Sequence, residues 1–110
     1  MFHTRKEKMK TLTDQLNAEE TIDLSSLDDM IGKAYFFRTV TYHLTGRIKK
    51  FLGNMIILED AAWIADSGRF MQAIKEGKLN EVEPVGDCLV NLSTVVDIFP
   101  WKHTLPKDQK

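Results

Sequence analysis

Three cations that lie close together in the sequence are the residues best placed to do chemistry. Arg47, Lys49 and Lys50 fall within a segment that has the composition of a β-strand, and Arg38 and His43 lie at neighbouring strand positions. Such a group can contact the phosphates of a nucleic acid, because each cation that neutralises a phosphate releases a counterion. The alternative is a solvated strand face, which is the usual role of a run of charges. The sequence leaves both interpretations open.

Three carboxylates, those of Glu59, Asp60 and Asp66, are candidates for a metal site or an acid–base pair. Adjacent residues of a strand point to opposite faces of the sheet, so we expect the side chains of Glu59 and Asp60 to diverge. We therefore interpret the first two as the end of a strand, and we expect Asp66 or Ser67 to cap a helix.

The histidines and the cysteine form no catalytic or metal-binding pattern. His3, His43 and His103 have no partner at the spacing of a zinc site. Cys88 lies beside an apolar run, and we expect it to be a small buried hydrophobic residue rather than a nucleophile. No glycine-rich phosphate loop is present. We therefore expect a protein that is not an enzyme and that uses no metal or cofactor.

Length and charge narrow the class of protein further. A chain of 110 residues fits one domain with a modest core and little surface for a deep cleft. Its formal net charge of −1 means that any binding to nucleic acid must come from a local basic patch. No apolar run approaches the roughly 20 residues that span a bilayer, and the first residues lack the apolar core of a signal peptide. We therefore expect a cytoplasmic protein without a membrane segment.

The elements that must position the basic residues begin after a polar N-terminal arm. Residues 1–24 are predicted to be mobile or loosely helical. Residues 25–32 have serines for an N-terminal cap, an apolar stripe and a final glycine, which predicts a short helix. Residues 35–44 are rich in aromatic and β-branched residues and predict a strand. Gly46 falls inside the strand that follows, where a glycine often marks a sharp bend.

The second half of the chain alternates between strand and helix signals. Residues 55–58 form a continuous apolar run, which predicts a strand covered on both faces. We expect residues 61–87 to form a helical insertion, with a capped helix that ends at Gly77. Two short strands, 88–90 and 94–99, are predicted next, and residues 102–110 are expected to form a loose polar tail.

Five short strands, with a strong bend in the second, predict a mainly β protein built as a small open barrel. The later strands carry apolar residues on both faces, more than one small core needs. Open strand edges and apolar strands of this kind favour pairing with another subunit. Trp63 and Trp101 fit equally well as anchors of such an interface and as core residues.

Residues 44–60 resemble the first sequence motif of the Sm-like (LSm, Hfq-like) family. That motif has a leucine two positions before a glycine, an aliphatic residue two positions after it, an aromatic residue three further on, and then an apolar run that ends in a polar pair. Residues 89–98 resemble the second motif, and the insertion is similar to that of phage or environmental members. The matching positions in the first motif are Leu44, Gly46, Ile48, Phe51, Met55, Ile57 and Leu58.

The resemblance implies a strongly bent five-stranded barrel over residues 25–101, with an N-terminal helix and a helical insertion between strands three and four. It implies a homo-oligomeric ring of about five to seven subunits, in which the fourth strand pairs with the neighbour's fifth. It explains Gly46 as the bend of the second strand. It also implies that RNA meets two loops at the pore, which here contain Asn54 and Asn91.

Both implied pore loops lack the aromatic platform and the cation that give the family its affinity for bases. We therefore expect any binding of RNA or other single-stranded nucleic acid to be weak and salt-dependent. The cations that would carry it are Arg47, Lys49 and Lys50. The alternative is a structural or scaffolding ring that has lost the family's RNA binding.

Overall fold

The structure is a computed structural model, and it describes residues 22–110. The predicted arm, residues 1–24, therefore lies outside the described residues except for its last three. The described part contains five β-strands, one α-helix and two short 3-10 helices, so the fold is mainly β as predicted. None of the helices in this part is long and apolar enough to cross a membrane.

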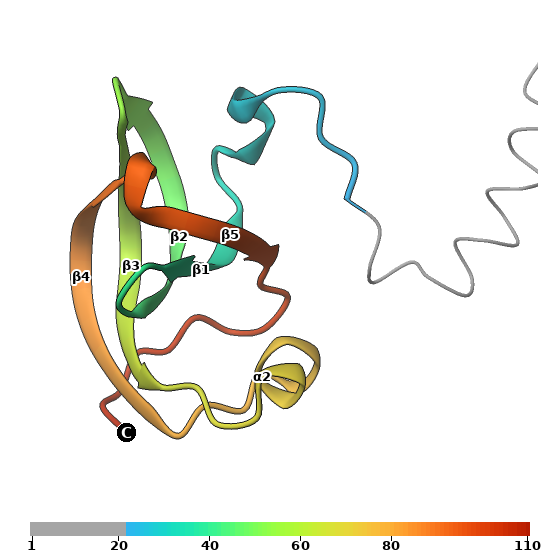
Figure 1. Cartoon of the computed structure of the whole chain (residues 1–110), viewed down its shortest axis with the longest axis vertical. Helices are drawn as coiled ribbons and strands as arrows, with labels where there is room; N and C mark the ends of the chain where they lie inside the picture. Colours follow the sequence, from blue (N-terminus) through green and yellow to red (C-terminus); the bar gives the residue numbers. More distant parts are fainter. Residues whose placement is uncertain (1–21) are drawn as a thin grey trace, which may run out of the picture.

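All five strands belong to one antiparallel sheet with the order β4-β3-β2-β1-β5. This order leaves β4 and β5 as the two edges of the sheet. In Figure 1 the long strands β2, β3 and β4 curve along the molecule, and the turn between β2 and β3 lies at the end opposite to the helix α2. The strands are β1 (Ala34–Thr39), β2 (His43–Leu52), β3 (Met55–Asp66), β4 (Glu81–Asn91) and β5 (Val95–Pro100).

The pairing of β2 with β3 is irregular around Gly46. The register shifts between Thr45 and Arg47, and on β3 the residue Asp60 has a positive φ of 52°. A Cβ atom added at Gly46 would lie 3.1 Å from the side chain of Leu58. The glycine therefore allows the two strands to approach closely where their pairing is broken.

One face of the sheet carries a hydrophobic core to which all five strands contribute, named the inner core below. Met30 of the 3-10 helix η2 (Leu27–Met30) closes it from above the sheet. The fully buried members include Phe37, Ile56 and Leu58. Of the apolar residues of the first motif, Leu44, Ile48 and Leu58 belong to this core, and Phe51 packs against it.

The opposite face carries a second hydrophobic core, named the outer core below. Phe36 and Phe37 are neighbours on β1 and are both fully buried, because successive strand residues point to opposite faces. The ring of Phe36 lies 5.8 Å from that of Phe70 in α2 (Phe70–Glu76) and 5.9 Å from that of Trp101. Figure 1 shows α2 and the C-terminal segment together at one end of the molecule, where they cover this face.

The helix predicted over residues 25–32 is not an α-helix. Only the single turn η2 forms, and its four residues have 3-10 geometry. Leu27 and Ile31 remain exposed, and only Met30 of the expected apolar stripe is buried. One buried side chain stabilises too little structure for a longer helix in this position.

The predicted helical insertion over residues 61–87 is not supported. β3 continues to Asp66 and β4 already begins at Glu81, so most of the expected insertion belongs to the sheet. Only residues 67–80 leave it, and they contain α2, which ends at Gly77 as predicted. Both faces of β3 are covered, so the alternation that marks a half-exposed strand is missing from its sequence.

The expected loose tail, residues 102–110, packs against the domain. Leu105 is buried in the outer core. The imidazole of His103 donates to the carbonyl oxygen of Ile74 at 2.8 Å, at the end of α2. The prediction of a loose tail is wrong, because the polar composition of the segment concealed an apolar anchor.

Candidate nucleic-acid interface

The turn between β2 and β3 and the loop between β4 and β5 are joined side by side at one end of the sheet (Figure 1). The Nδ2 group of Asn54 in the turn donates to Oδ1 of Asn91 at 3.0 Å and to Oγ of Ser93 at 2.6 Å. The backbone N–H of Leu92 donates to the carbonyl oxygen of Asn54 at 2.8 Å. The structure therefore brings together the two asparagines that the sequence placed in separate loops.

These hydrogen bonds leave only part of the side-chain amides of Asn54 and Asn91 free to bind a ligand. Oδ1 of Asn91 also accepts from the backbone N–H of Ser93 at 2.9 Å and so caps η3 (Leu92–Thr94). Within residues 22–110, no hydrogen bond involves Oδ1 of Asn54 or Nδ2 of Asn91. One acceptor and one donor therefore remain for a ligand, while the other polar atoms hold the loops together.

The three predicted cations do not share one environment. Lys49 and Lys50 are exposed near the loop end of β2, and neither forms an ion pair with an acidic side chain of residues 22–110. Arg47 instead faces the carboxylates of β3. The two lysines are therefore available for phosphate, and Arg47 is held by the protein itself.

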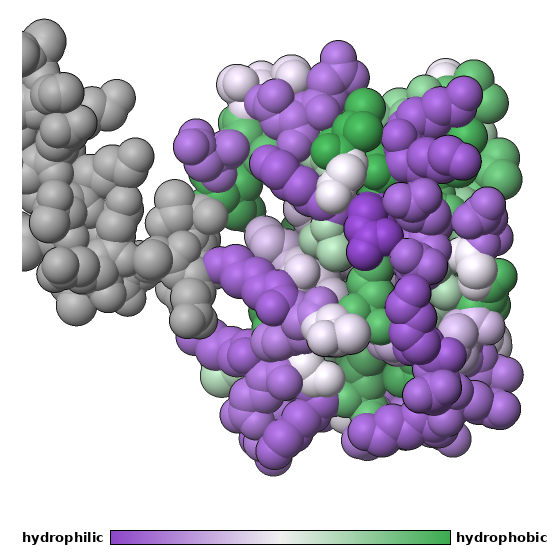
Figure 2. Space-filling view, turned by 180° about the vertical axis from the view of Figure 1, so that it is seen from behind, coloured by the Kyte–Doolittle hydropathy of each residue, from purple (hydrophilic) through white to green (hydrophobic). Residues whose placement is uncertain are grey.

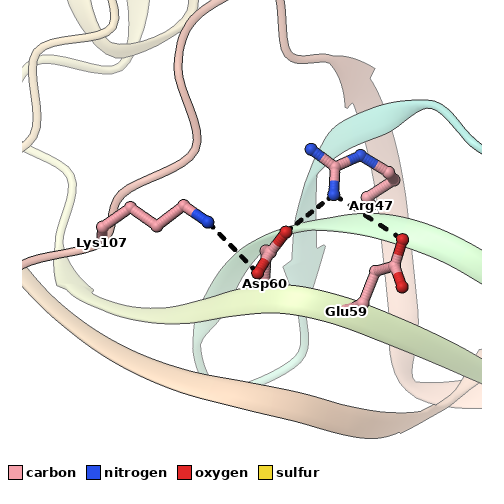
Figure 3. A network of polar contacts seen from close by, with 4 residues as sticks. All are labelled: Arg47, Glu59, Asp60 and Lys107. Atoms are coloured by element: carbon pink, nitrogen blue, oxygen red, sulfur yellow. Dashed lines mark hydrogen bonds and ion pairs between the residues drawn. The ribbon is translucent and has the colours of Figure 1, made fainter.

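Arg47 belongs to the polar network drawn in Figure 3. Its guanidinium donates to Oδ2 of Asp60 at 2.8 Å and lies 3.7 Å from the carboxylate of Glu59. Lys107 approaches the other oxygen of Asp60 at 3.3 Å. The hydrogen bond from Arg47 is the main reason why the pKa of Asp60 lies below its ordinary value, and Lys107 adds to it. The network ties β2, β3 and the C-terminal segment together.

This network was not expected from the sequence, since Glu59 and Asp60 were predicted to diverge. Both carboxylates contact the same guanidinium. The positive φ of Asp60 interrupts the alternation of the strand and turns its side chain toward Arg47. The prediction of divergence is therefore wrong, and the irregular backbone at Asp60 is the reason.

Two exposed leucines lie next to the joined loops. Leu52 and Leu89 are 55% and 58% exposed, and Figure 2 shows hydrophobic surface along the upper edge of the molecule on the side of β4. The segments 52–55 and 91–94 contain no aromatic residue and no arginine. A nucleic-acid base that reached this end would meet leucine side chains and amides, without a flat ring to stack on.

Arg38 and His43 lie away from the loops, on the face of the outer core. The guanidinium of Arg38 donates to Oδ1 of Asp97 at 2.7 Å and lies over the ring of Phe70, 5.1 Å from its centre. Burial, and then the nearby charge of Arg38, lower the pKa of His43. These two residues therefore do not extend the basic patch of Lys49 and Lys50.

Trp63 and Tyr42 form an aromatic pair that the sequence did not single out as a pair. Their ring centres are 5.8 Å apart, and 40% of Trp63 is exposed, whereas only 5% of Trp101 is. The two tryptophans therefore differ in their environment: Trp101 is a core residue, and Trp63 is a surface residue. Only the turn between β1 and β2 could have revealed the pair, because it brings Tyr42 beside β3. No glycine or proline marks this turn in the sequence.

The histidine, cysteine and acidic side chains of the described residues do not gather into a metal-binding group. In residues 22–110, no three side chains of histidine, cysteine, aspartate or glutamate lie close enough to hold a metal ion. Cys88 packs partly against the inner core, and burial raises the pKa of its thiol. A raised pKa keeps a thiol protonated at neutral pH and makes it a poor nucleophile.

The fold is similar to that of solved Sm proteins. A heptameric archaeal Sm protein matches with a TM-score of 0.50 and 25% identity, over 67% of this chain and 93% of that one. The Sm protein of the P. aerophilum heptamer matches with a TM-score of 0.51 and 23% identity, over 71% of this chain and 96% of that one. The fold is therefore Sm-like.

A third similar structure comes from a different assembly. A chain of the NatC complex bound to CoA matches with a TM-score of 0.53 and 17% identity, over 74% of this chain and 91% of that one. No family model and no curated protein sequence matches the chain. Since one fold serves in more than one kind of assembly, the function must be argued from the edges and loops of this chain.

Proposed function

We propose that this chain is the subunit of a homo-oligomeric Sm-like ring, in which the β4 edge of one copy pairs with the β5 edge of the next. The observation that carries the proposal is the strand order, which makes β4 and β5 the two edge strands of one bent sheet. The archaeal Sm protein of similar fold is described as heptameric. A ring of about five to seven subunits closes every such edge without requiring a second kind of interface.

The side chains at both edges support this interface. Val85 and Leu89 on β4 are 50% and 58% exposed, and Val96 on β5 is 62% exposed. Apolar side chains beside open backbone groups are a liability in a monomer, since both favour uncontrolled association. Pairing of the two edges would cover them.

We further propose that the ring binds single-stranded nucleic acid weakly, through Lys49 and Lys50 at its loop end. Both lysines are exposed, and neither is ion-paired with a residue of the described chain. A ring repeats the pair in every subunit, and the repetition strengthens a weak single contact by avidity. The remaining amide groups of Asn54 and Asn91 would then face the bases.

Native mass spectrometry with and without a short RNA tests both parts. The expected spectrum shows one closed oligomer of about five to seven copies. Fluorescence anisotropy with oligo-U, oligo-A and single-stranded DNA across a salt series then measures binding. Replacing Lys49 and Lys50 by alanine should reduce the dependence of log affinity on log salt by about 0.7 for each phosphate that is no longer neutralised. The matched control is the double variant Lys78→Ala with Lys102→Ala, on the segments that follow α2 and β5. It should change neither the mass of the oligomer nor the salt dependence of its affinity.

A compact monomer at micromolar concentration would overturn the ring. Tight binding to oligo-U that survives high salt and disappears in Asn54→Ala would overturn the lysine mechanism in favour of base recognition by the loops. A ring that binds none of the three oligonucleotides would support the second candidate, a scaffolding ring. The observation that favours this second candidate is that the amides of Asn54 and Asn91 already hold the two loops together.

A further inference from the structure

The outer edge of β4 is divided into two unequal parts. At its lower end the backbone N–H of Val82 donates to the carbonyl oxygen of Lys110 at 3.0 Å, and the N–H of Lys110 donates to the carbonyl oxygen of Val82 at 2.9 Å. Two reciprocal bonds between one pair of residues are the pattern of an antiparallel strand pair. The C-terminal segment therefore occupies this end of the edge as a short added strand.

Three interactions hold the C-terminal segment in that position. Leu105 is buried in the outer core, and His103 is bonded to the end of α2. The amino group of Lys107 lies 3.3 Å from Asp60 (Figure 3). Because the segment is anchored before it reaches β4, its pairing with Val82 is part of the folded subunit.

Pro84 separates the covered part of the edge from the open part. The N–H and carbonyl groups of alternate strand residues point to the same side, so the backbone nitrogen of Pro84 lies on the same outer edge as that of Val82. A proline nitrogen has no hydrogen to donate, and prolines within sheets are found where no ladder bond is needed. The edge that remains for a partner strand is therefore residues 85–91.

The length of this open edge fits the strand that would pair with it. β4 has 11 residues, whereas β5 has only 6 (Val95–Pro100). A neighbour's β5 would leave about a third to a half of β4 uncovered if nothing else occupied it. The exposed apolar side chains of β4, Val85 and Leu89, both lie in the open part.

We propose that the C-terminal segment sets the limits of the subunit interface: the β5 strand of a second copy pairs with residues 85–91 of β4, and the segment around Lys110 fills the rest of the edge. The inference rests on the proposed ring. It assigns two tasks to the segment, which are to fix where the neighbour's strand stops and to prevent a further chain from adding to the uncovered end. The polar sequence of the segment suits an edge that faces solvent.

Removal of residues 108–110 tests the proposal, and replacement of the same three residues by alanine is the matched control, since alanines keep the backbone groups. Hydrogen exchange reports the protection of β4, and native mass spectrometry reports assembly. In the full chain the amide of Val82 and the amides of residues 85–91 that point away from β3 should all exchange slowly. In the truncated chain the amide of Val82 should exchange at least tenfold faster, and species larger than the ring should accumulate, whereas the alanine control should behave as the full chain.

A point substitution tests the same contact without shortening the chain. Lys110→Pro, compared with Lys110→Ala, keeps the whole segment and removes one donor, so it should shift assembly in the same direction even if the truncated chain folds poorly.

The outcomes separate the two proposals. Unchanged exchange of Val82 after truncation would show that the segment does not hold this edge. Faster exchange of Val82 with a ring of unchanged mass, and no larger species in either variant, would show that the segment does not limit assembly. A full-length monomer in which the amides of residues 85–91 that point away from β3 exchange quickly would instead overturn the ring, whatever the truncated chain does.

Discussion

The two faces of the sheet are buried in different ways. The inner core draws on all five strands and is closed by one short 3-10 turn, from which only Met30 is buried. The outer core draws on fewer strand residues and is closed by segments outside the sheet, namely α2 and the chain after β5. Its rings are in mutual contact: Phe36 meets Phe70, Trp101 and His43.

The two cores together explain why the sheet is covered on both faces at only one of its ends. Three residues of the first motif, Leu44, Ile48 and Leu58, lie in the inner core. The outer core depends on two segments that fold back over the end of the sheet opposite to the joined loops (Figure 1). The loop end is not covered in this way and keeps exposed leucines and lysines.

We expect the largest effect from removing the ring of Trp101, which lies at the centre of the outer core. Trp101→Ala deletes a side chain that is 5% exposed and stacks on Phe36, so it should lower the free energy of unfolding by about 3–5 kcal/mol. Trp63→Ala removes the same side chain from a half-exposed position and should cost clearly less. Urea unfolding of both variants makes the measurement. Equal losses would mean that α2 and the C-terminal segment do not stabilise the sheet.

A second test disturbs the inner core alone. In Gly46→Val the new Cβ would lie 3.1–3.2 Å from the side chain of Leu58, and its two methyl groups would have to find further room. We expect a loss of about 1–3 kcal/mol of unfolding free energy from overpacking. Gly46→Ala adds only the Cβ and is the graded control. An unchanged melting temperature in the valine variant would contradict the close approach of β2 to β3.

The inner core was the more predictable of the two faces, because its signal is local. The spacing of Leu44, Gly46, Ile48 and Leu58 predicted the bent strand and the apolar run that follows, and these residues lie in or against the inner core. The outer core was missed. Its cover comes from Leu105 in a polar segment and from the continuation of β3 past residue 60, where no alternation marks a strand.

The turn between β1 and β2 was hidden for a different reason. Residues 35–44 were predicted as one strand because they are rich in aromatic and β-branched residues, and no glycine or proline interrupts them. The hydroxyl of Thr39 makes the turn instead: it donates to the carbonyl oxygen of Tyr42 at 2.6 Å and accepts from the N–H of Tyr42 at 3.0 Å. Threonine hydroxyls can replace backbone groups in turns, but their weak preference gives little warning in a sequence.

The candidate site was predictable in its residue types and unpredictable in its pairing. Asn54 and Asn91 were placed in the two loops, and Lys49 and Lys50 on the second strand. The contact between the asparagines follows from the antiparallel pairing of Met55 with Asn91 in β3 and β4. The engagement of Arg47 could not be foreseen, since it depends on the positive φ of Asp60. Whether these residues bind nucleic acid stays a prediction.

A third test uses a buried polar atom of β2 that has no hydrogen-bond partner among the described residues. The Oγ1 atom of Thr45 is buried and has no hydrogen-bond partner in the described structure. Thr45→Val replaces the hydroxyl with a methyl group of similar shape and removes the cost of an unsatisfied polar atom, so it should raise the free energy of unfolding by about 1 kcal/mol. Thr39→Val is the contrasting control, because that hydroxyl is bonded and its loss should destabilise. A destabilised Thr45→Val variant would show that this hydroxyl has a partner in solution.

The smallest expected effect concerns pH, and it also separates the two faces. On the outer core, burial and the charge of Arg38 lower the pKa of His43, while Asp97 opposes them. On the inner core, Tyr35 and Cys88 have pKa values that burial raises further above neutrality, so neither should titrate between pH 5.5 and 7.5. The sensitivity of stability to mildly acidic pH should therefore come from the outer face.

The direction follows from linkage. The unfolded chain binds a proton at His43 near the ordinary pKa of about 6.5, before the folded chain does. Stability should therefore be full above pH 7 and should fall as the pH drops through 6.5 toward the lower folded pKa. His43→Gln removes the titrating group and should flatten the curve of unfolding free energy between pH 7.5 and 5.5. Because the ring is only partly buried, the change should be smaller than that of the three substitutions above. A variant that keeps the full slope would show that His43 is not the source of the pH dependence.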